Sequence, residues 1–337
     1  MWPWMAGRPR HCLRIGARGL VWAEARRDWK GRTRHRCAVT ELAPGLIRVS
    51  PVDVNIADAT ALEARLRGLI GPERQLRVAG RTLVRQIPLP IALILPDLCV
   101  RAVVFQLDQL PARTEEREAL IRWRVGQEQL VPLAEAKVVS QVLSLGRPAK
   151  GPHTVLAVVV QEAVLAQYEA VCESAGLIPL EVDIVSFRLF NLWASATGWS
   201  GASAGDLMWL NVADGGLTLF LFHDGRLAFL RTKLHGASGS SEDGSNAGPE
   251  EQSRKVIDEC LASIQACRER YPRLALKRLV FAADDPDPEL PDMLAQELDL
   301  TVQPLNWSQI QRAGWKPAGK VTDAVAMPAI AGVLSPS

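Results

Sequence analysis

The stretch Asp206–Leu234, DLMWLNVADGGLTLFLFHDGRLAFLRTKL, constrains the fold of this chain more than any other part of the sequence. Its apolar, β-rich runs predict three short strands, at 207–212, 217–222 and 226–233. Asp-Gly pairs at 214–215 and 224–225 fall between these runs. They favour tight hairpins, because glycine accepts the positive φ that such turns need. The sequence therefore predicts an antiparallel meander with two tight turns.

A second glycine turn of the same plan lies near the N-terminus. Predicted strands at Cys12–Ile15 and Gly19–Glu24 flank Gly16, and the plan matches the one around Gly215 and Gly216. Small residues in such turns allow backbone N–H groups to approach an anion, for example a nucleotide phosphate. The repeated plan predicts two related halves, each opening with a glycine-turned hairpin. A pair of plain meanders is the alternative explanation.

The rest of the chain alternates between strand and helix patterns, which is typical of an α/β protein. Predicted helices lie at 57–70, 114–130, 161–175, 185–196, 250–271, 288–298 and 323–334. Further predicted strands lie at 36–42, 46–49, 82–87, 91–95, 100–107, 138–145, 154–160, 177–184, 277–281 and 300–304. The helix at 114–130 is expected to bury Leu120, Ile121, Trp123, Val125 and Leu130. The Ser/Gly-rich segment 235–249 has little apolar surface to bury and is expected to be a disordered loop.

Charge and cysteine content exclude several classes of protein. The net charge of +2 gives no overall electrostatic footprint for a nucleic acid. The six cysteines are scattered without a C-x-x-C pair, and no histidine stands at metal-ligand spacing from them. A reduced compartment and the absence of a metal site are therefore expected. The N-terminus lacks the apolar core of a signal peptide and no apolar run reaches membrane-spanning length, so a cytosolic protein is expected.

The first fifty residues are unusually basic. They contain eleven Arg or Lys residues against three acidic residues. Such a surplus can lie against an anionic membrane surface or an acidic partner. The alternative is that it forms an ordinary solvated face.

Several motifs then follow one another in a recognisable order. Ala92–Leu143 contains a Leu-Pro-Asp step between two strands, then a charged helix, a Val-Pro step and a further strand. Val155–Phe190 contains Ala-Gly-Leu-x-Pro and Val-Asp-x-x-Ser-Phe. The central stretch continues past Gly225 as Phe-Leu-Arg at 229–231, and Asp323–Leu334 contains a terminal Ala-Val-Ala helix. In this succession the chain resembles the type IV pilus assembly protein PilM family over most of its length.

The resemblance implies an α/β protein with the actin-like ATPase fold: two RNase H-like halves and an inserted small α/β subdomain. It implies first-half strands at 1–51, the inserted subdomain at 52–175, a return to the first half with a linker at 176–205, and the second half at 206–337. The cytoplasmic part of the type II secretion protein GspL has a related fold.

The resemblance also implies a location and a partner. Members of the PilM family lie in the cytosol beneath the inner membrane and contact other pilus machinery. They bind the short cytoplasmic tail of the bitopic membrane protein PilN. In this chain the groove for such a tail is expected between the first half and the inserted subdomain, where an extended or helical segment would dock.

The phosphate-binding positions that the resemblance identifies are partly replaced. Active relatives begin the first turn with an Asp and continue with a hydroxyl residue and a lysine, whereas this chain has Arg14, Gly19 and Val21. The second turn begins with Asn211 instead of Asp, and the adenosine loop reads Ala-Ala-Asp-Asp at 282–285. The two missing Asp residues are those that hold Mg²⁺ through its waters. These losses predict a degenerate nucleotide site with no cofactor.

Some positions remain that could contact a nucleotide if one binds. They are Gly16, Asn211, Asp214, Gly215, Gly216 and Thr218. Arg14 has three roles open to it: it could face a phosphate, pair with Asp214 or lie at the rim of the cleft.

Three functional hypotheses follow. The preferred one is a non-enzymatic scaffold, peripheral at the inner membrane, with no catalytic residue. The second is a divergent actin-like ATPase or sugar-kinase relative that binds ATP and Mg²⁺, for which Asp183 is the one attractive catalytic carboxylate. Its competing role is to cap the helix that starts after Ile184. The third is an unrelated α/β binding module.

Overall fold

The computed structural model describes residues 9–27, 33–71, 76–78, 81–83, 88–128, 131–143, 152–199, 205–234, 248–285, 287–305 and 323–334. The strands are β1 His11–Ile15, β2 Gly19–Arg27, β3 Thr33–Glu41, β4 Leu76–Val78, β5 Arg81–Leu83, β6 Leu89–Leu95, β7 Arg101–Leu107, β8 Ala136–Leu143, β9 His153–Gln161, β10 Leu177–Ile184, β11 Leu207–Ala213, β12 Gly216–His223, β13 Arg226–Leu234, β14 Arg278–Ala283 and β15 Thr301–Pro304. The helices are α1 Ala59–Ile70, α2 Thr114–Gln127, α3 Glu162–Ser174, α4 Val185–Thr197, α5 Pro249–Arg270, α6 Leu290–Leu298, α8 Asp323–Leu334 and a 3-10 turn, η2, at Asp97–Cys99.

Two five-stranded sheets have the same strand plan. The first sheet has the order β10-β6-β1-β2-β3 and the second has the order β13-β12-β11-β14-β15. Each contains an antiparallel meander, followed by two strands parallel to the first strand of that meander. The first sheet, starting from β3, and the second sheet, starting from β13, therefore have the same sequence of strands: the third, second and first strand of the meander, then the two parallel strands. This confirms the two related halves that the repeated glycine turn predicts.

The hairpin turns of the second sheet have the geometry that their sequence favours. Asp214 and Gly215 have φ of 53° and 76°, and Asp224 and Gly225 have φ of 48° and 71°. Two consecutive positive φ values define a type I′ turn, whose twist matches that of the flanking strands. The register is fixed by the pairs on either side, for example Ala213 with Gly216. These pairs hold the turn at 214–215 at the point where β11 ends and β12 begins.

Helices cover the outer face of each sheet. In the first half, Leu62 of α1 and Tyr168 of α3 are fully buried against the sheet. In the second half, Ile257 of α5 and Leu294 of α6 are fully buried against theirs. Each half therefore has its own hydrophobic core, as two separately packed layers require.

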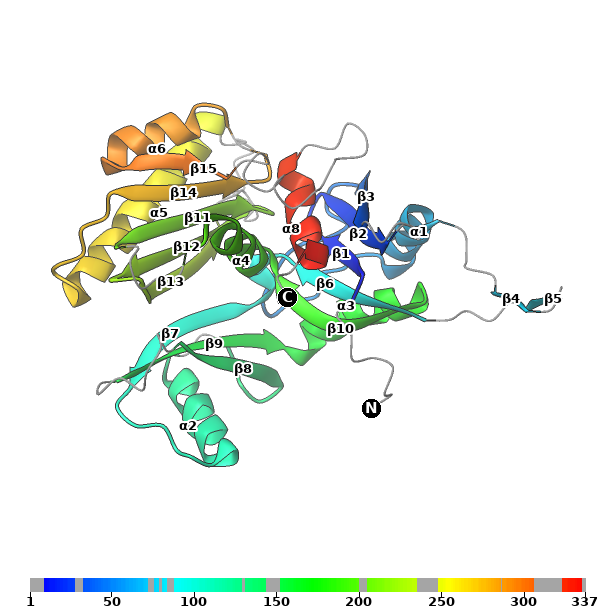
Figure 1. The fold of residues 1–337 in the computed structure, drawn as a ribbon, viewed down its shortest axis with the longest axis horizontal. Helices are drawn as coiled ribbons and strands as arrows, with labels where there is room; N and C mark the ends of the chain where they lie inside the picture. The colour runs from blue at the N-terminus through cyan, green and yellow to red at the C-terminus, as the bar shows by residue number, and fades with distance from the viewer. Residues whose placement is uncertain are drawn as a thin grey trace.

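Two further helices, α4 and α8, lie between the halves (Figure 1). Their apolar side chains share one core with the inner faces of both sheets, for example Trp193 of α4 with Trp209 of β11. Helix α8 packs on β1 and β2, and the position of a Cβ at Gly332 lies 2.3 Å from Cys12 Sγ. Only glycine allows this approach, so the last helix is seated directly on the first strand.

A third sheet lies apart from the two main ones, below them in Figure 1. It has the order β7-β9-β8 and is covered by α2, whose Ile121 and Val125 are buried against Phe105. It forms the compact part of the predicted range 52–175. Strand β6 from the same range pairs between β1 and β10, so it belongs to the first sheet.

Two predictions about local structure are wrong. Trp123 is 61% exposed, because it lies two residues from both Ile121 and Val125 and therefore points to the opposite side of α2. Residues 46–49 form a single bridge, Ile47 to Ile56, instead of a strand. The Asn55 side chain accepts the Ser50 N–H there and competes with a strand ladder. Parts of the predicted elements at 84–87, 129–130, 144–145 and 235–247 lie outside the described residues.

Candidate functional site

The two glycine turns face each other where the halves meet. The backbone N–H of Ala17, in the first turn, donates to Asp214 Oδ1, in the second turn, at 2.7 Å. A Cβ at Gly16 would lie 2.8 Å from the same oxygen, so the first turn approaches Asp214 as closely as glycine permits. The two turns predicted as phosphate-binding hairpins are therefore in direct contact.

Arg14 fills the space behind this contact. Its Nη2 lies 3.0 Å from Asp214 Oδ2 and 2.5 Å from Asp284 Oδ2, and its Nη1 donates to the Val325 carbonyl at 3.0 Å. The Arg14 and Asp214 side chains are only 3% and 5% exposed. One guanidinium from β1 thus joins the β11–β12 turn, the end of β14 and the first turn of α8. We call Arg14, Asp214 and Asp284 the cleft ion cluster.

The cluster is strongly coupled by charge. Burial disfavours the charged guanidinium, but Asp284 and Asp214 outweigh this effect and raise the pKa of Arg14 above its ordinary value. Burial raises the pKa of Asp284 to about 6, although Arg14 opposes that shift. The buried Arg14 guanidinium compensates the charges of both carboxylates, and its removal would leave both charges uncompensated.

A second polar cluster lies at the base of the cleft. Asp97 Oδ1 accepts the Ser186 backbone N–H at 2.9 Å, and Asp97 Oδ2 accepts the Asn211 side-chain amide at 3.3 Å and the Ser186 hydroxyl. Asn211 also donates to Ser186 Oγ at 3.0 Å. Burial raises the pKa of Asp97 above its ordinary value. Asn211 suits this place because its amide donates, which a carboxylate could not do.

Asp183 has a different role from the one predicted. Its Oδ1 accepts only the adjacent Ile184 N–H, at 2.8 Å, and its Oδ2 lies 2.6 Å from Arg188 Nε. Burial raises its pKa to about 6. The N–H of Ser186, inside the first turn of α4, is satisfied by Asp97 instead. The helix cap predicted for Asp183 is therefore supplied by Asp97.

The sequence-predicted site residues lie in these two clusters or in the hairpin beside them. Gly16 and Asp214 belong with Arg14, and Gly215 provides the positive φ of the turn. Asn211 pairs in register with Thr218, whose hydroxyl lies 3.2 Å from that of Thr232. Gly216 packs on Leu98, with its Cβ position 2.7 Å from Leu98 Cδ1.

Sequence reasoning missed several contributors to these clusters: Asp97, Ser186 and Val325. Asp97 and Ser186 stand in the Leu-Pro-Asp and Val-Asp-x-x-Ser-Phe motifs, which are the signals that could have indicated them. The rim role considered for Arg14 is wrong, since the side chain is buried and pairs with Asp214.

The space for a ligand at the cleft is small. The pocket bordered by Asn211, Ala283, Asp284 and Met327 measures about 20 Å³. This is the order of volume that one water occupies, whereas small-molecule pockets measure hundreds of cubic ångströms. Both oxygens of Asp214 are already engaged, by Ala17 N–H and by Arg14. In this arrangement Asp214 therefore offers no unengaged oxygen to a metal ion or a ligand.

A group of possible metal ligands occurs elsewhere, at Asp206, His223 and Asp224. Asp206 Oδ1 accepts from His223 Nδ1 at 3.0 Å and from Asp224 N–H at 2.9 Å, and its Oδ2 accepts from Ala275 N–H at 2.5 Å. The carboxylate thus holds the β12–β13 turn with protein hydrogen bonds.

Among the described helices, none is long and apolar enough to span a membrane.

Comparisons with known proteins agree with this architecture. No protein-family model matches the chain, and no curated protein does. Among solved structures, a chain of the PilM-PilN type IV pilus biogenesis complex superposes with a TM-score of 0.68 at 18% identity, covering 96% of this chain and 99% of that one. The cytoplasmic domain of EpsL, an inner-membrane component of the type II secretion system of Vibrio cholerae, gives a TM-score of 0.44 at 10% identity, covering 95% and 94%. The superposition on the pilus complex chain, over nearly the full length of both chains, together with the two matching five-stranded sheets, shows that the chain has the actin-like ATPase fold.

Proposed function

We propose that this chain is a cytoplasmic scaffold of a type IV pilus or type II secretion-like assembly at the inner membrane, and that it works without ATP turnover. The cleft ion cluster carries this proposal. It stands where the two glycine turns converge, which is where an actin-like ATPase holds phosphates and Mg²⁺. In this chain the protein's own charges link the two halves at that place.

A nucleotide would have to break this link. A triphosphate facing Arg14 would displace Asp214 and Asp284, whose carboxylates would then lie beside the phosphate charge without a cation. Uncompensated buried charge costs several kcal/mol in the folded state, so the closed cluster competes effectively against ATP. This argument supports a pseudo-ATPase.

The partner that we propose is the short cytoplasmic tail of a PilN-like membrane protein. Support comes from the fold shared with a chain of the PilM-PilN complex and from the edges of two sheets. Strand β10 is the outer strand of the first sheet and exposes Leu180 and Val182, while β8 is the outer strand of the inserted sheet and exposes Val139. An unpaired strand edge with apolar side chains can accept an extended segment by strand addition.

Peripheral membrane contact is part of the same proposal. A partner tail places the scaffold close to the inner surface of the bilayer. Among the described residues of the basic N-terminal region, Arg10, Arg36 and Arg48 are exposed. Cations of this kind are attracted to anionic lipid headgroups over about one Debye length, roughly 10 Å.

Calorimetry with ATP and Mg²⁺ tests the nucleotide part of the proposal. We expect no binding heat for the purified full chain at millimolar nucleotide. Arg14→Met is a useful second sample, because it removes the cation and leaves Asp214 and Asp284 free to hold a metal. Micromolar, Mg²⁺-dependent binding to the wild-type chain would instead favour the divergent ATPase.

Co-purification tests the partner. The tagged chain is co-expressed with the PilN-like subunit of the same organism, and detergent-solubilised membranes are passed over the tag resin. We expect retention of the subunit, and its loss with Leu180→Glu or Val182→Glu. Leu261→Glu is the matched control, because Leu261 has a similar exposure of 42% but lies on α5 in the second half. Equal retention by all three variants would place the tail elsewhere.

A further inference from the structure

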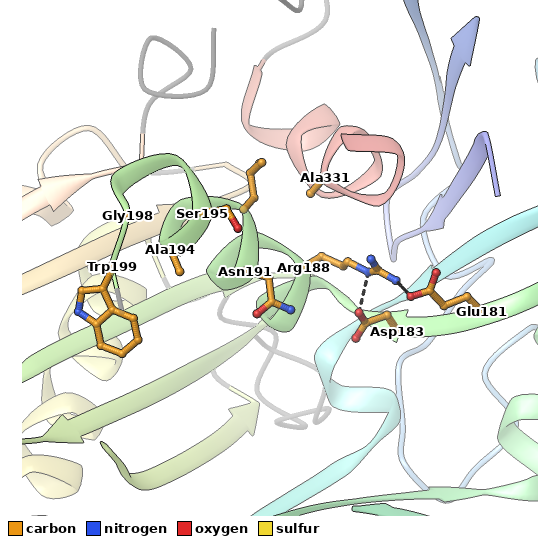
Figure 2. A pocket seen from close by; sticks show the side chains of 10 residues that line it. Glu181, Asp183, Arg188, Asn191, Ala194, Ser195, Gly198, Trp199 and Ala331 are labelled. Carbon is orange, nitrogen blue, oxygen red and sulfur yellow. Dashed lines mark hydrogen bonds and ion pairs between the residues drawn. The ribbon is translucent and has the colours of Figure 1, made fainter. Parts of the chain in front are cut away.

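A pocket of about 520 Å³ opens between β10, α4 and α8. It is lined at one end by Glu181 and Asp183 of the edge strand, and at the other end by Trp199, just after α4 (Figure 2). Its volume falls in the range of small-molecule pockets, whereas the pocket at the cleft ion cluster does not. The tail docking proposed above uses Leu180 and Val182 of β10, whereas this pocket is lined by Glu181 and Asp183 of the same strand.

The strand end of the pocket has an excess of negative charge. Arg188 projects from α4 between the two carboxylates: its Nε lies 2.6 Å from Asp183 Oδ2, and its Nη2 pairs with Glu181 Oε1. The Arg188 side chain is 8% exposed, whereas that of Glu181 is 43% exposed. One guanidinium faces two carboxylates, so a negative charge remains and Glu181 presents it to the open pocket.

This arrangement favours a cationic ligand over an anionic one. The donors of Arg188 are already directed at carboxylates, so a phosphate or carboxylate ligand would meet an occupied cation and the repulsion of Glu181. A cationic group instead finds the outer oxygen of Glu181 accessible from the pocket. Charge-assisted hydrogen bonds from an ammonium or guanidinium group to a carboxylate are stronger than neutral ones.

The rest of the pocket suits an elongated apolar body. Asn191 and Ser195 follow Arg188 along the same side of α4, and Figure 2 shows them between the charged end and Trp199. Leu192 and Ala194 add apolar lining, and Figure 2 shows Ala194 beside the indole. An indole face packs well against an alkyl or aromatic stem. The pocket is thus polar and anionic at one end and aromatic at the other.

We propose that this pocket binds an organic cation in which one ammonium or guanidinium group is carried on an alkyl or aromatic stem. The cation contacts Glu181 and Asp183, and the stem extends towards Trp199. The chemistry is the same for a free amine and for an Arg or Lys side chain next to an apolar residue in a peptide. The proposal does not depend on the scaffold function.

Three compounds with one stem test the charge selection: phenylbutylamine, phenylbutanol and phenylbutyrate. Titration calorimetry on the full chain is expected to show the amine binding at least about tenfold more tightly than the alcohol, with the acid weakest. An acetylated arginyl-phenylalanine amide forms a further arm. Preference for this dipeptide over the amine indicates a peptide ligand, and the reverse indicates a free amine.

Variants locate the binding. Glu181→Gln removes the accessible charge and is expected to abolish the preference for amine over alcohol. Ser195→Trp fills the pocket from an exposed position and is expected to abolish binding of both. Glu63→Gln is the control, since it removes a carboxylate that pairs with an arginine on α1, outside the pocket. The proposal is overturned if amine and alcohol bind equally, if neither cation binds, or if Glu181→Gln and Ser195→Trp bind the amine as the wild type does.

Discussion

Arg14 and Asp214 are 200 residues apart in the sequence, and their side chains meet at 3.0 Å in the buried centre of the molecule. The contact joins the first strand of one half to the first hairpin of the other. Asp284, from a third segment of the chain, pairs with the same guanidinium at 2.5 Å. The halves are therefore connected by charge at the place where the two glycine turns converge.

Replacing Arg14 should be costly. Arg14→Met leaves buried Asp214 and partly buried Asp284 without their cation, and we expect the free energy of unfolding to fall by about 3–5 kcal/mol. Urea denaturation followed by circular dichroism measures this change. Arg18→Met is the control: Arg18 pairs with Asp285 where both side chains are more than four-fifths exposed, so a loss under about 1 kcal/mol is expected.

The triple variant Arg14→Met, Asp214→Asn, Asp284→Asn then separates charge from packing. It is expected to recover part of the stability lost in Arg14→Met, because the uncompensated carboxylates are gone. A triple variant no more stable than Arg14→Met would mean that the guanidinium acts through its packing and its bond to Val325.

Gly16 should not tolerate a side chain. Alanine there places Cβ 2.8 Å from Asp214 Oδ1, so the two turns must separate and the Ala17 to Asp214 hydrogen bond must lengthen. We expect a loss of about 1–3 kcal/mol by urea denaturation. Gly68→Ala is the matched control, because nothing lies within 4 Å of that Cβ and α1 gains a better helix former. Stabilisation of roughly 0.5–1 kcal/mol is expected there.

Restoring an acid at position 211 should not restore a nucleotide site. Asn211→Asp removes the amide that donates to Asp97 and Ser186 and adds a carboxyl group beside buried Asp97. We expect about 2–4 kcal/mol of destabilisation and no ATP binding by calorimetry, since Arg14 still holds Asp214. Gln141→Glu, at an exposed position of β8, is the control for adding one negative charge. Mg²⁺-dependent ATP binding by a fully stable Asn211→Asp chain would contradict this account.

The stability of the cleft ion cluster should depend on pH through Asp284. Its pKa is raised from 3.8 to about 6, so the folded chain binds a proton that the unfolded chain does not. This group's contribution to stability is present in full below pH 3.8 and is lost as the pH rises through about 6. Asp183 has a raised pKa of about 6 as well and adds to the same trend.

Chemical denaturation at pH 5 and pH 7.5 measures this dependence. The wild-type chain is expected to lose more stability between the two pH values than Asp284→Asn does, by roughly 1–3 kcal/mol. Asp285→Asn, at the exposed neighbouring position, should keep the wild-type slope. An unchanged slope in Asp284→Asn would show that the carboxyl group titrates alike in both states.

Local patterns account for most of the fold that the sequence predicted. The Asp-Gly turns and the β-rich runs fix the hairpins, because the positive φ values are a property of two adjacent residues. The pairing of Arg14 with Asp214 was one of three roles that the sequence left open for the arginine. Trp123 was misplaced because apolar character alone does not say which side of a helix a residue occupies.

What could not be predicted depends on segments that meet only in the folded chain. The carbonyl of Val325 and the carboxylate of Asp284 reach Arg14 across 311 and 270 positions. The cap of α4 was assigned to adjacent Asp183, whereas Asp97, 89 positions before Ser186, provides it. A local sequence pattern cannot predict contacts between residues so far apart, because the order of strands in the sheets determines which segments meet.

The packing of α8 on β1 affects the order in which the chain can fold during its synthesis. Translation delivers β1 long before Asp323–Leu334, and Gly332 of the later segment packs against Cys12 of the earlier one. The part of β1 and β2 that α8 covers therefore stays exposed while the intervening chain is synthesised. Domains fold from the N-terminus as they emerge, but here the joint between the halves can close only after Asp323–Leu334 has left the ribosome. A premature stop just before α8 would leave a protein whose halves are folded and whose centre is open to water.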